Sequence, residues 1–211
     1  MIRNTSFPSK ENVELKQERI EVSFNNMTLN QVSSYTSLQQ SAEGEEATFD
    51  EAVQTGFKYY REGKASESLF HFARALRQRE DKPELLPVKA EVLIAISNVH
   101  SFRSDPIKSI HALQYSLEML VAYYGPRSPP VAVVLQKLAN EYANIRQPET
   151  AIQCLCEALA IALASHNVHV SSIWRALGKQ LLTLGLIEDA QTCFDEAKEH
   201  SHGSSTEFSS N

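Results

Sequence analysis

The sequence is short of cysteine, of positive charge and of long apolar runs. Cys154, Cys156 and Cys193 are odd in number and confined to the C-terminal half, which is no disulfide framework, so we expect reduced thiols. Lys and Arg number 20 against 26 Asp and Glu, and the net charge of −6 argues against a general phosphate-backbone binder. No signal-peptide-like run and no stretch of about 18 apolar residues occurs. We therefore expect a cytosolic or nuclear protein, most simply cytoplasmic, that binds neither nucleic acid nor membrane.

Signals of β-structure are also scarce. Neither Asn-Gly nor Asp-Gly occurs, and β-rich runs are missing between Phe49 and His200. Hydrophobic residues at 42% and charged residues at 22% are ordinary for a globular chain, and 211 residues suit one domain with tails. Because apolar residues of the middle segment recur at helical spacing, the sequence predicts an all-α domain of eight helices of about 14 residues each.

The two ends of the chain differ from this middle segment. Residues 1–48 are rich in Ser, Asn, Gln and Thr and end in the acidic run Glu43-Gly44-Glu45-Glu46, and residues 201–211 are similarly polar. Such segments bury too little apolar surface to order alone, which predicts two disordered tails. Within the first tail, Ile20-Glu21-Val22-Ser23-Phe24 alternates apolar and polar residues, the pattern of one strand or of a short motif that docks elsewhere.

Helix boundaries are marked by proline and glycine. Pro106 and Pro148 follow Asp105 and Gln147 at expected first helical positions, where proline's fixed φ suits the helix. Gly63 and Gly185 stand at expected turns between helices, where a left-handed residue lets the chain reverse. The breaks fall in pairs, which predicts helix-turn-helix units.

Comparison of the sequence with itself reveals a repeat. An ungapped shift of 42 residues places Val92–Met119 on Val134–Ile161 with matching small and apolar positions. The last unit reads Trp174-x-x-Leu177-Gly178-x-x-Leu181, followed by Gly185, Ala190-x-x-x-Phe194 and Ala197. This pattern resembles the tetratricopeptide repeat, with Leu181 in place of tyrosine. The resemblance implies a right-handed α-solenoid of four helix-turn-helix units, at about 49–82, 84–124, 130–165 and 170–200.

Small residues on the first helices are expected to face large ones on the second. Gly56, Ser97, Ala139 and Gly178 stand 41, 42 and 39 residues apart, and their expected partners are Phe72, Leu113, Leu155 and Phe194. This period exceeds the roughly 34 residues of the plain repeat. The connection Tyr124-Gly125-Pro126-Arg127-Ser128-Pro129-Pro130-Val131-Ala132 is similar to that of kinesin light chain repeats, with Ser128 in place of histidine.

No set of residues predicts catalysis or a cofactor. Cys154 and Cys156 are two residues apart, so on a helix their thiols point to different sides and cannot chelate one zinc ion. His166, His169, His200 and His202 lack supporting ligands and are read as surface histidines. Trp174 is read as a helix-packing residue. We expect no metal, no cofactor and no enzyme activity.

A binding surface is expected on the first helices, on the side away from the second helices. Stacked repeats form a concave wall there, and the tetratricopeptide resemblance implies which residues line it. They are Phe57, Tyr60 and Arg61, with Val53, from the first repeat; Ile94, Asn98 and Phe102, with Ser101, from the second; Gln136, Asn140 and Asn144 from the third; and Arg175 and Lys179, with Thr183, from the fourth. Val53 and Phe57 stand where chaperone co-factors carry a Lys and Asn clamp, so chaperone-tail binding is not expected.

Two functions fit this wall. In the first, the chain is a protein-binding adaptor or scaffold that holds an extended, partly acidic peptide of a partner protein, because amides grip a main chain and Arg175 with Lys179 suits a carboxylate. In the second, it is an assembly subunit whose groove or C-terminal end is permanently covered, for example in a homodimer through the last repeat, where Leu181, Leu182, Leu184 and Leu186 would otherwise be uncovered. A variant places Ile20, Val22 and Phe24 in the groove.

Overall fold

The structure, a computed structural model, describes residues 48–78, 82–165 and 169–202. The helices described below belong to one unit of the chain, Phe49–Asn211. The predicted tails, including Ile20–Phe24, lie outside the described residues, except that Thr48 is described and that Ser201 and His202 belong to the last helix.

Between Phe49 and His202 the described residues form α-helices, one short 3-10 helix and no strand, which confirms the all-α prediction. The elements are α2 (Phe49–Arg61), α3 (Ala65–Arg77), η2 (Pro83–Leu85), α4 (Leu86–Phe102), α5 (Pro106–Tyr124), α6 (Pro129–Asn144), α7 (Pro148–Ala164), α8 (Val170–Thr183) and α9 (Ile187–His202). Pro106 and Pro148 begin α5 and α7 as expected, and the Asp105 side chain accepts a hydrogen bond from the Lys108 backbone N–H at the start of α5.

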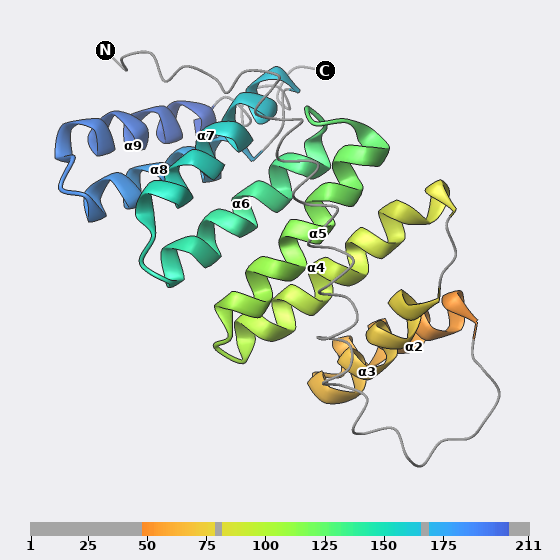
Figure 1. The fold of residues 1–211 in the computed structure, drawn as a ribbon. Coiled ribbons are helices and arrows are strands. Elements are labelled where there is room, and N and C mark those ends of the chain that lie inside the picture. The colour runs from red at the N-terminus through yellow and green to blue at the C-terminus, as the bar shows by residue number, and fades with distance from the viewer. Residues whose placement is uncertain (1–47, 79–81, 166–168, 203–211) are drawn as a thin grey trace. The chain divides into compact units, whose positions relative to one another are not determined.

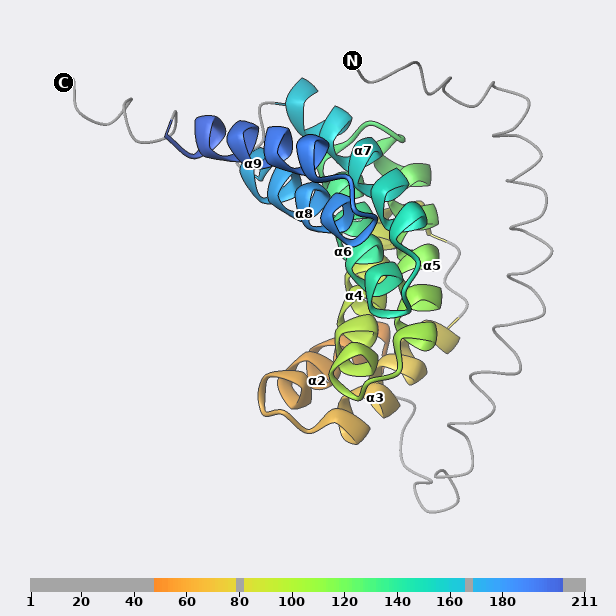
Figure 2. The ribbon, with the colours of Figure 1, turned by 90° about the vertical axis from the view of Figure 1, so that its left-hand side faces the viewer.

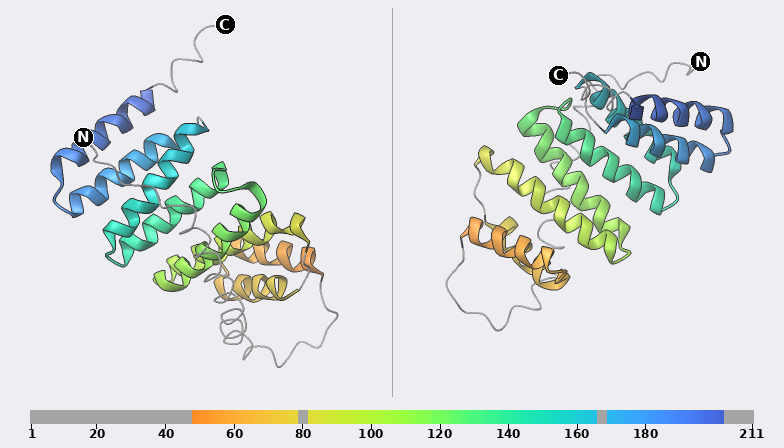
Figure 3. Two further views of the ribbon diagram at one scale, coloured as in Figure 1. Left: turned by 45° about the horizontal axis from the view of Figure 1, so that its top comes forward. Right: turned by 180° about the vertical axis from the view of Figure 1, so that it is seen from behind.

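The helices pack as consecutive pairs, α2 with α3, α4 with α5, α6 with α7 and α8 with α9. Each pair also contacts the next pair along the chain. The contacting helices are α3 and α4, α5 and α6, and α7 and α8 (Figures 1 and 3). Within this unit, α4 and α6 lie on one side, and α5 and α7 lie on the other (Figure 2). This arrangement is an α-solenoid, in which each repeat covers the apolar side of its neighbours.

One tight turn joins the two helices of each pair, and the four turns have the same geometry. The second residue after each first helix has a positive φ: 72° at Gly63, 59° at Ser104, 59° at Arg146 and 77° at Gly185. The next backbone N–H then donates to a carbonyl five residues earlier, as from Lys64 to Tyr59 and from Leu186 to Leu181. These are Schellman-type helix ends, and the expectation for Gly63 and Gly185 is met.

The expected contact of small against large residues is present in the first and last pairs. A Cβ atom at Gly56 would lie 2.5 Å from Cδ1 of Phe72, and one at Gly178 would lie 2.8 Å from Cε1 of Phe194. In the middle pairs, Ser97 and Ala139 are buried, as are Leu113 and Leu155. The close approach of the paired helices therefore depends on these small side chains.

The apolar core consists of two clusters. Phe49, Ala52, Val53, Phe72 and Ala75 of α2 and α3 pack with Val92 and Ala95 of α4. The second cluster begins at Ala90 of α4 and continues to Cys193 of α9. Pro83–Phe102 is the one described helical segment long and apolar enough to span a membrane, but its α4 residues form parts of both clusters, which is how a core helix of a solenoid packs.

Candidate functional site

Hydrogen bonds join the first helices of all four repeats across their shared side. The Asn98 Nδ2 atom on α4 donates to the Tyr60 hydroxyl on α2 at 3.1 Å. The Lys137 Nζ atom on α6 donates to the Asn98 Oδ1 atom at 3.2 Å. The Gln136 Nε2 atom on α6 donates to the Ser172 Oγ atom on α8 at 3.1 Å. We call this side of α2, α4, α6 and α8 the first-helix face.

An open hollow of about 830 Å³ lies at the α2 end of this face. Among the residues that the structure describes, its lining comes from α2: Val53, Gln54, Thr55, Phe57, Lys58, Tyr60 and Arg61. Phe57 is held in place by Phe72, whose ring centroid lies 5.0 Å away in an edge-on arrangement. The hollow therefore combines a rigid aromatic surface with the cationic side chains of Lys58 and Arg61.

The predicted wall residues differ in their exposure. Phe57, Tyr60, Ile94, Asn98 and Gln136 are half-buried, whereas Arg61, Phe102, Asn140, Asn144, Arg175 and Lys179 are exposed. The side chains of Phe57, Tyr60 and Ile94 also pack against the core clusters. The wall thus has an apolar base at the α2 and α4 end and exposed polar or cationic groups on α6 and α8.

Asn98 has a structural role that its sequence position did not reveal. Its amide nitrogen and its amide oxygen each already have a partner on a neighbouring first helix, Tyr60 and Lys137. An asparagine amide has two donor hydrogens and two acceptor lone pairs, so one of each is left for a ligand. Asn140, at the equivalent position of the third repeat, is exposed. Asn98 therefore offers a ligand a positioned amide, and Asn140 a free-standing one.

Sequence reasoning missed several residues of this face. Lys137 and Ser172 take part in the interhelix hydrogen bonds, and Gln54 and Lys58 line the hollow. A signal for Lys137 was available, because the repeat alignment places it with Gln54, Ala95 and Ala176, so it is the one cation of that column. Its direction toward Asn98 could not be read from helical spacing alone.

The charges near the face are mostly cationic side chains on exposed positions. Arg175 and Lys179 are exposed and one helical turn apart on α8. On α2, the Arg61 Nε atom donates to the Phe57 carbonyl at 3.3 Å, which holds its guanidinium near the hollow. Glu141 is a buried carboxylate on α6 and accepts a hydrogen bond of 3.4 Å from the Asn144 side chain. Asn144 is therefore anchored by its own helix.

The described part of the chain holds no group of three or more His, Cys, Asp or Glu residues that could bind a metal ion. Burial raises the pKa of the Cys154 thiol to about 11 and also raises the pKa values of Cys156 and Cys193. A thiol is a nucleophile only as thiolate, so these environments disfavour cysteine reactivity. Trp174 is half-buried and packs against the core, as expected from the repeat.

Sequence comparisons find no match, whereas structure comparisons find solved structures of similar fold. The chain matches no protein-family description, and no curated protein matches its sequence. Among solved structures, kinesin light chain-type TPR-like repeats from Podosopora anserina align with a TM-score of 0.63 at 12% identity, covering 95% of this chain and 100% of that one. The apo form of RapI aligns with a TM-score of 0.68 at 15% identity, covering 87% of this chain and 68% of that one.

A third similar structure is BtubC (BKLC) from P. vanneervenii, with a TM-score of 0.61 at 16% identity, covering 88% of this chain and 77% of that one. At these identities the likeness concerns the fold. It agrees with the helix pairs, the four equivalent turns and the contacts of Gly56 with Phe72 and of Gly178 with Phe194. The chain has the tetratricopeptide-repeat fold, with repeats like those of kinesin light chain.

Proposed function

We propose that the protein is a non-catalytic adaptor that holds an extended, partly acidic peptide of a partner protein along the first-helix face. The observation that carries the proposal is the continuity of this face. Hydrogen bonds from Asn98 to Tyr60, from Lys137 to Asn98 and from Gln136 to Ser172 join four helices, and the α2 hollow opens at one end. Solenoid repeats use such extended surfaces for binding.

The chemistry of the face changes along its length and suggests how a peptide lies on it. An aromatic or aliphatic side chain suits the hollow with Phe57 and Tyr60. The amides of Asn98, Asn140 and Asn144 can donate to and accept from a peptide main chain. Arg175 and Lys179 suit a carboxylate at the far end. Although the whole chain is acidic, the cationic side chains of Arg175 and Lys179 favour acidic groups at this end of the face.

The test is a binding measurement on the full chain. The probes are extended 12-residue peptides of one aromatic residue and four Asp or Glu, with the same peptides carrying Lys at the acidic positions as comparison. Because charge pairing at an exposed surface is screened, the affinity for acidic peptides should fall with salt. Changing Arg175 and Lys179 together to Ala should weaken binding by about tenfold or more.

A matched control changes Lys108 and Lys198 to Ala, which removes the same charge from α5 and α9, away from the face. This double variant should bind as wild type does. Equal affinity for the acidic and lysine peptides, or equal losses in both double variants, would overturn the acidic part of the proposal. Catalysis is not part of the proposal, and the raised pKa values of Cys154 and Cys156 weigh against these thiols as nucleophiles.

A further inference from the structure

The turn between α8 and α9 exposes a group of large apolar side chains. Leu182, Leu184, Leu186 and Ile187 are 47%, 38%, 45% and 69% exposed, and we call these four residues the terminal apolar patch. They lie within six consecutive residues at the turn between the two helices. Leu181, the other leucine of this turn, is half-buried and packs against the core.

The same turn is polar in the first two repeats, whereas the third carries Gln147 and Ile145, and Ile145 packs against the core. By their backbone hydrogen bonds, Leu184 and Leu186 correspond to Glu62 and Lys64 in the first repeat. In the second repeat, Arg103 and Asp105 occupy these two positions. The backbone geometry of the turn therefore does not require apolar residues there. Exposed apolar groups without a role in the fold mark a contact surface.

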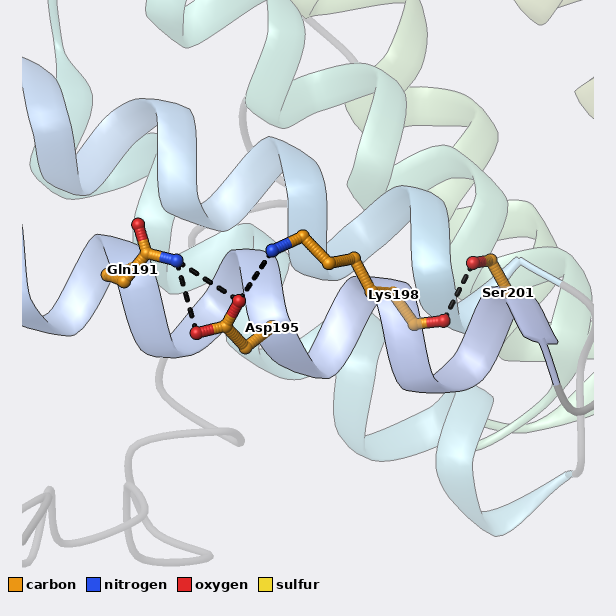
Figure 4. A network of polar contacts seen from close by, with 4 residues as sticks. All are labelled: Gln191, Asp195, Lys198 and Ser201. Atoms are coloured by element: carbon orange, nitrogen blue, oxygen red, sulfur yellow. Dashed lines mark hydrogen bonds and ion pairs between the residues drawn. The ribbon is translucent and has the colours of Figure 1, made fainter.

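The patch is separate from the surface on which a further repeat would stack. That surface is the outer side of α9, where the Gln191 side chain donates to both Asp195 carboxylate oxygens at 3.0 and 3.1 Å (Figure 4). Lys198 pairs with Asp195 at 2.7 Å. A repeat stacked on this side would bury these charged groups at high cost. The polar side of α9 thus caps the solenoid, and the patch needs another explanation.

We infer that the terminal apolar patch is the contact surface for a second copy of this chain. The charges beside the patch carry this choice of occupant. Lys179 lies one helical turn before Leu182 on α8, and Glu188 and Asp189 follow Ile187 in the first turn of α9. Around a two-fold axis through the patch, the same surface meets itself, so each lysine faces the acidic turn of the other copy. Cation and acid then pair on both sides of an apolar centre.

The strength of this contact follows from its size. A stable interface buries roughly 800 Å² on each partner, and four aliphatic side chains provide only part of that area. The expected assembly is a weak, reversible dimer whose population rises with protein concentration. Lys179 also belongs to the proposed peptide-binding surface, so the dimer is tested by the mass of the protein without peptide, a readout that peptide binding does not affect.

The test is sedimentation velocity on the full chain from micromolar to millimolar concentration. Wild type should shift from monomer to dimer over this range. The double variant Leu184→Glu with Leu186→Lys takes the residues that the first repeat carries at the equivalent positions, so the turn is retained. It should stay monomeric, which corresponds to a weakening of at least about tenfold. The control Phe102→Ser, at a side chain that is 89% exposed on α4, should dimerise as wild type does.

A charge exchange tests the identity of the partner independently of the leucines. Lys179→Glu should weaken the dimer, and adding Glu188→Lys and Asp189→Lys to it should restore the dimer, because both copies then carry the exchanged pairs. A wild type that is monomeric at every concentration would overturn the inference and leave the patch to a different partner. A dimer that survives both the leucine variant and the charge exchange unchanged would also overturn it.

Discussion

The side chain of Phe72 fills the space that a Cβ atom at Gly56 would occupy, with 2.5 Å between that position and the Phe72 Cδ1 atom. Phe72 is fully buried and also contacts Phe57 edge-on. The ring therefore cannot move aside without displacing other core residues. The pair fixes the distance between α2 and α3 and supports the floor of the α2 hollow.

We expect Gly56→Ala to destabilise the protein by roughly 1–3 kcal/mol. The free-energy cost of overpacking a rigid core is larger than the roughly 1 kcal/mol by which alanine favours a helix over glycine. Gly178→Ala should cost less, because Phe194 is only half-buried. Urea unfolding measures both changes. Gln54→Ala, at an exposed position of α2, is the control. A Gly56→Ala variant as stable as wild type would show that the ring can shift freely.

Two of the four turns hold a non-glycine residue in the left-handed region, which offers a route to greater stability. Ser104 and Arg146 both have a φ of 59° where Gly63 and Gly185 have 72° and 77°. A left-handed residue with a side chain costs roughly 1–2 kcal/mol, partly offset by the extra chain entropy of glycine. Ser104→Gly and Arg146→Gly should therefore each stabilise the protein by about 0.5–1 kcal/mol.

The reverse changes provide the matched comparison for these turns. No atom lies within 4 Å of a Cβ placed at Gly63 or Gly185, so alanine there would be strained by its backbone alone. Gly63→Ala and Gly185→Ala should each destabilise by about 1 kcal/mol in the same unfolding experiment. If the changes to glycine at Ser104 and Arg146 and the changes to alanine at Gly63 and Gly185 shifted stability in the same direction, the left-handed geometry of the turns would be refuted.

Glu118 on α5 makes stability depend on pH. Burial raises the pKa of its carboxyl from 4.5 to about 6. The folded state therefore binds the Glu118 proton more tightly than the unfolded state, and this contribution to stability, complete below pH 4.5, is lost as pH rises through about 6. Glu118→Gln should raise the melting temperature relative to wild type at pH 7.5, and the difference should vanish near pH 4.5.

Glu84→Gln is the control for this pH dependence, because Glu84 is exposed. Its melting temperature should follow that of wild type at both pH values. If Glu118→Gln raised the melting temperature by the same amount at pH 4.5 and at pH 7.5, the effect would come from packing and not from the charge of Glu118.

The two aligned asparagines of the first-helix face should behave differently on substitution. Asn98→Ala removes two hydrogen bonds and leaves the half-buried Tyr60 hydroxyl and Lys137 ammonium without this partner, which should cost about 1–3 kcal/mol. Asn140→Ala, at an exposed position, should change stability by less than about 0.5 kcal/mol. Thermal unfolding compares the two variants, and equal losses would contradict the bridging role of Asn98.

The fold could be predicted from the sequence because its signals are local and repeated. Pro106 and Pro148 mark helix starts, Gly63 and Gly185 mark turns, and Gly56 with Phe72 follows from spacing in a known repeat. The left-handed turns at Ser104 and Arg146 carry no such signal, since neither residue type favours a positive φ. The repeat alignment, and not the residue type, places them beside Gly63 and Gly185.

The candidate site was less predictable because side-chain direction is a tertiary property. Helical spacing placed Asn98 and Asn140 on the same side of their helices, but it could not show that Asn98 binds Tyr60 and Lys137. Long side chains such as Lys137 reach partners that their Cα positions do not suggest. The roles of the wall residues in peptide binding stay predictions.

The division of the apolar core has a consequence for how the protein opens. Val92 and Ala95 of α4 are the buried residues through which that helix joins the cluster of α2 and α3, while Ala90 belongs to the other cluster. Such a chain of nearest-neighbour contacts can open one terminal unit at a time. Backbone amides of α2 and α3 should therefore exchange with solvent deuterium sooner than those of α6 and α7. A molecule that bound both the Tyr60 and the Asn98 side chain would hold the α2–α3 pair against α4 and slow that exchange.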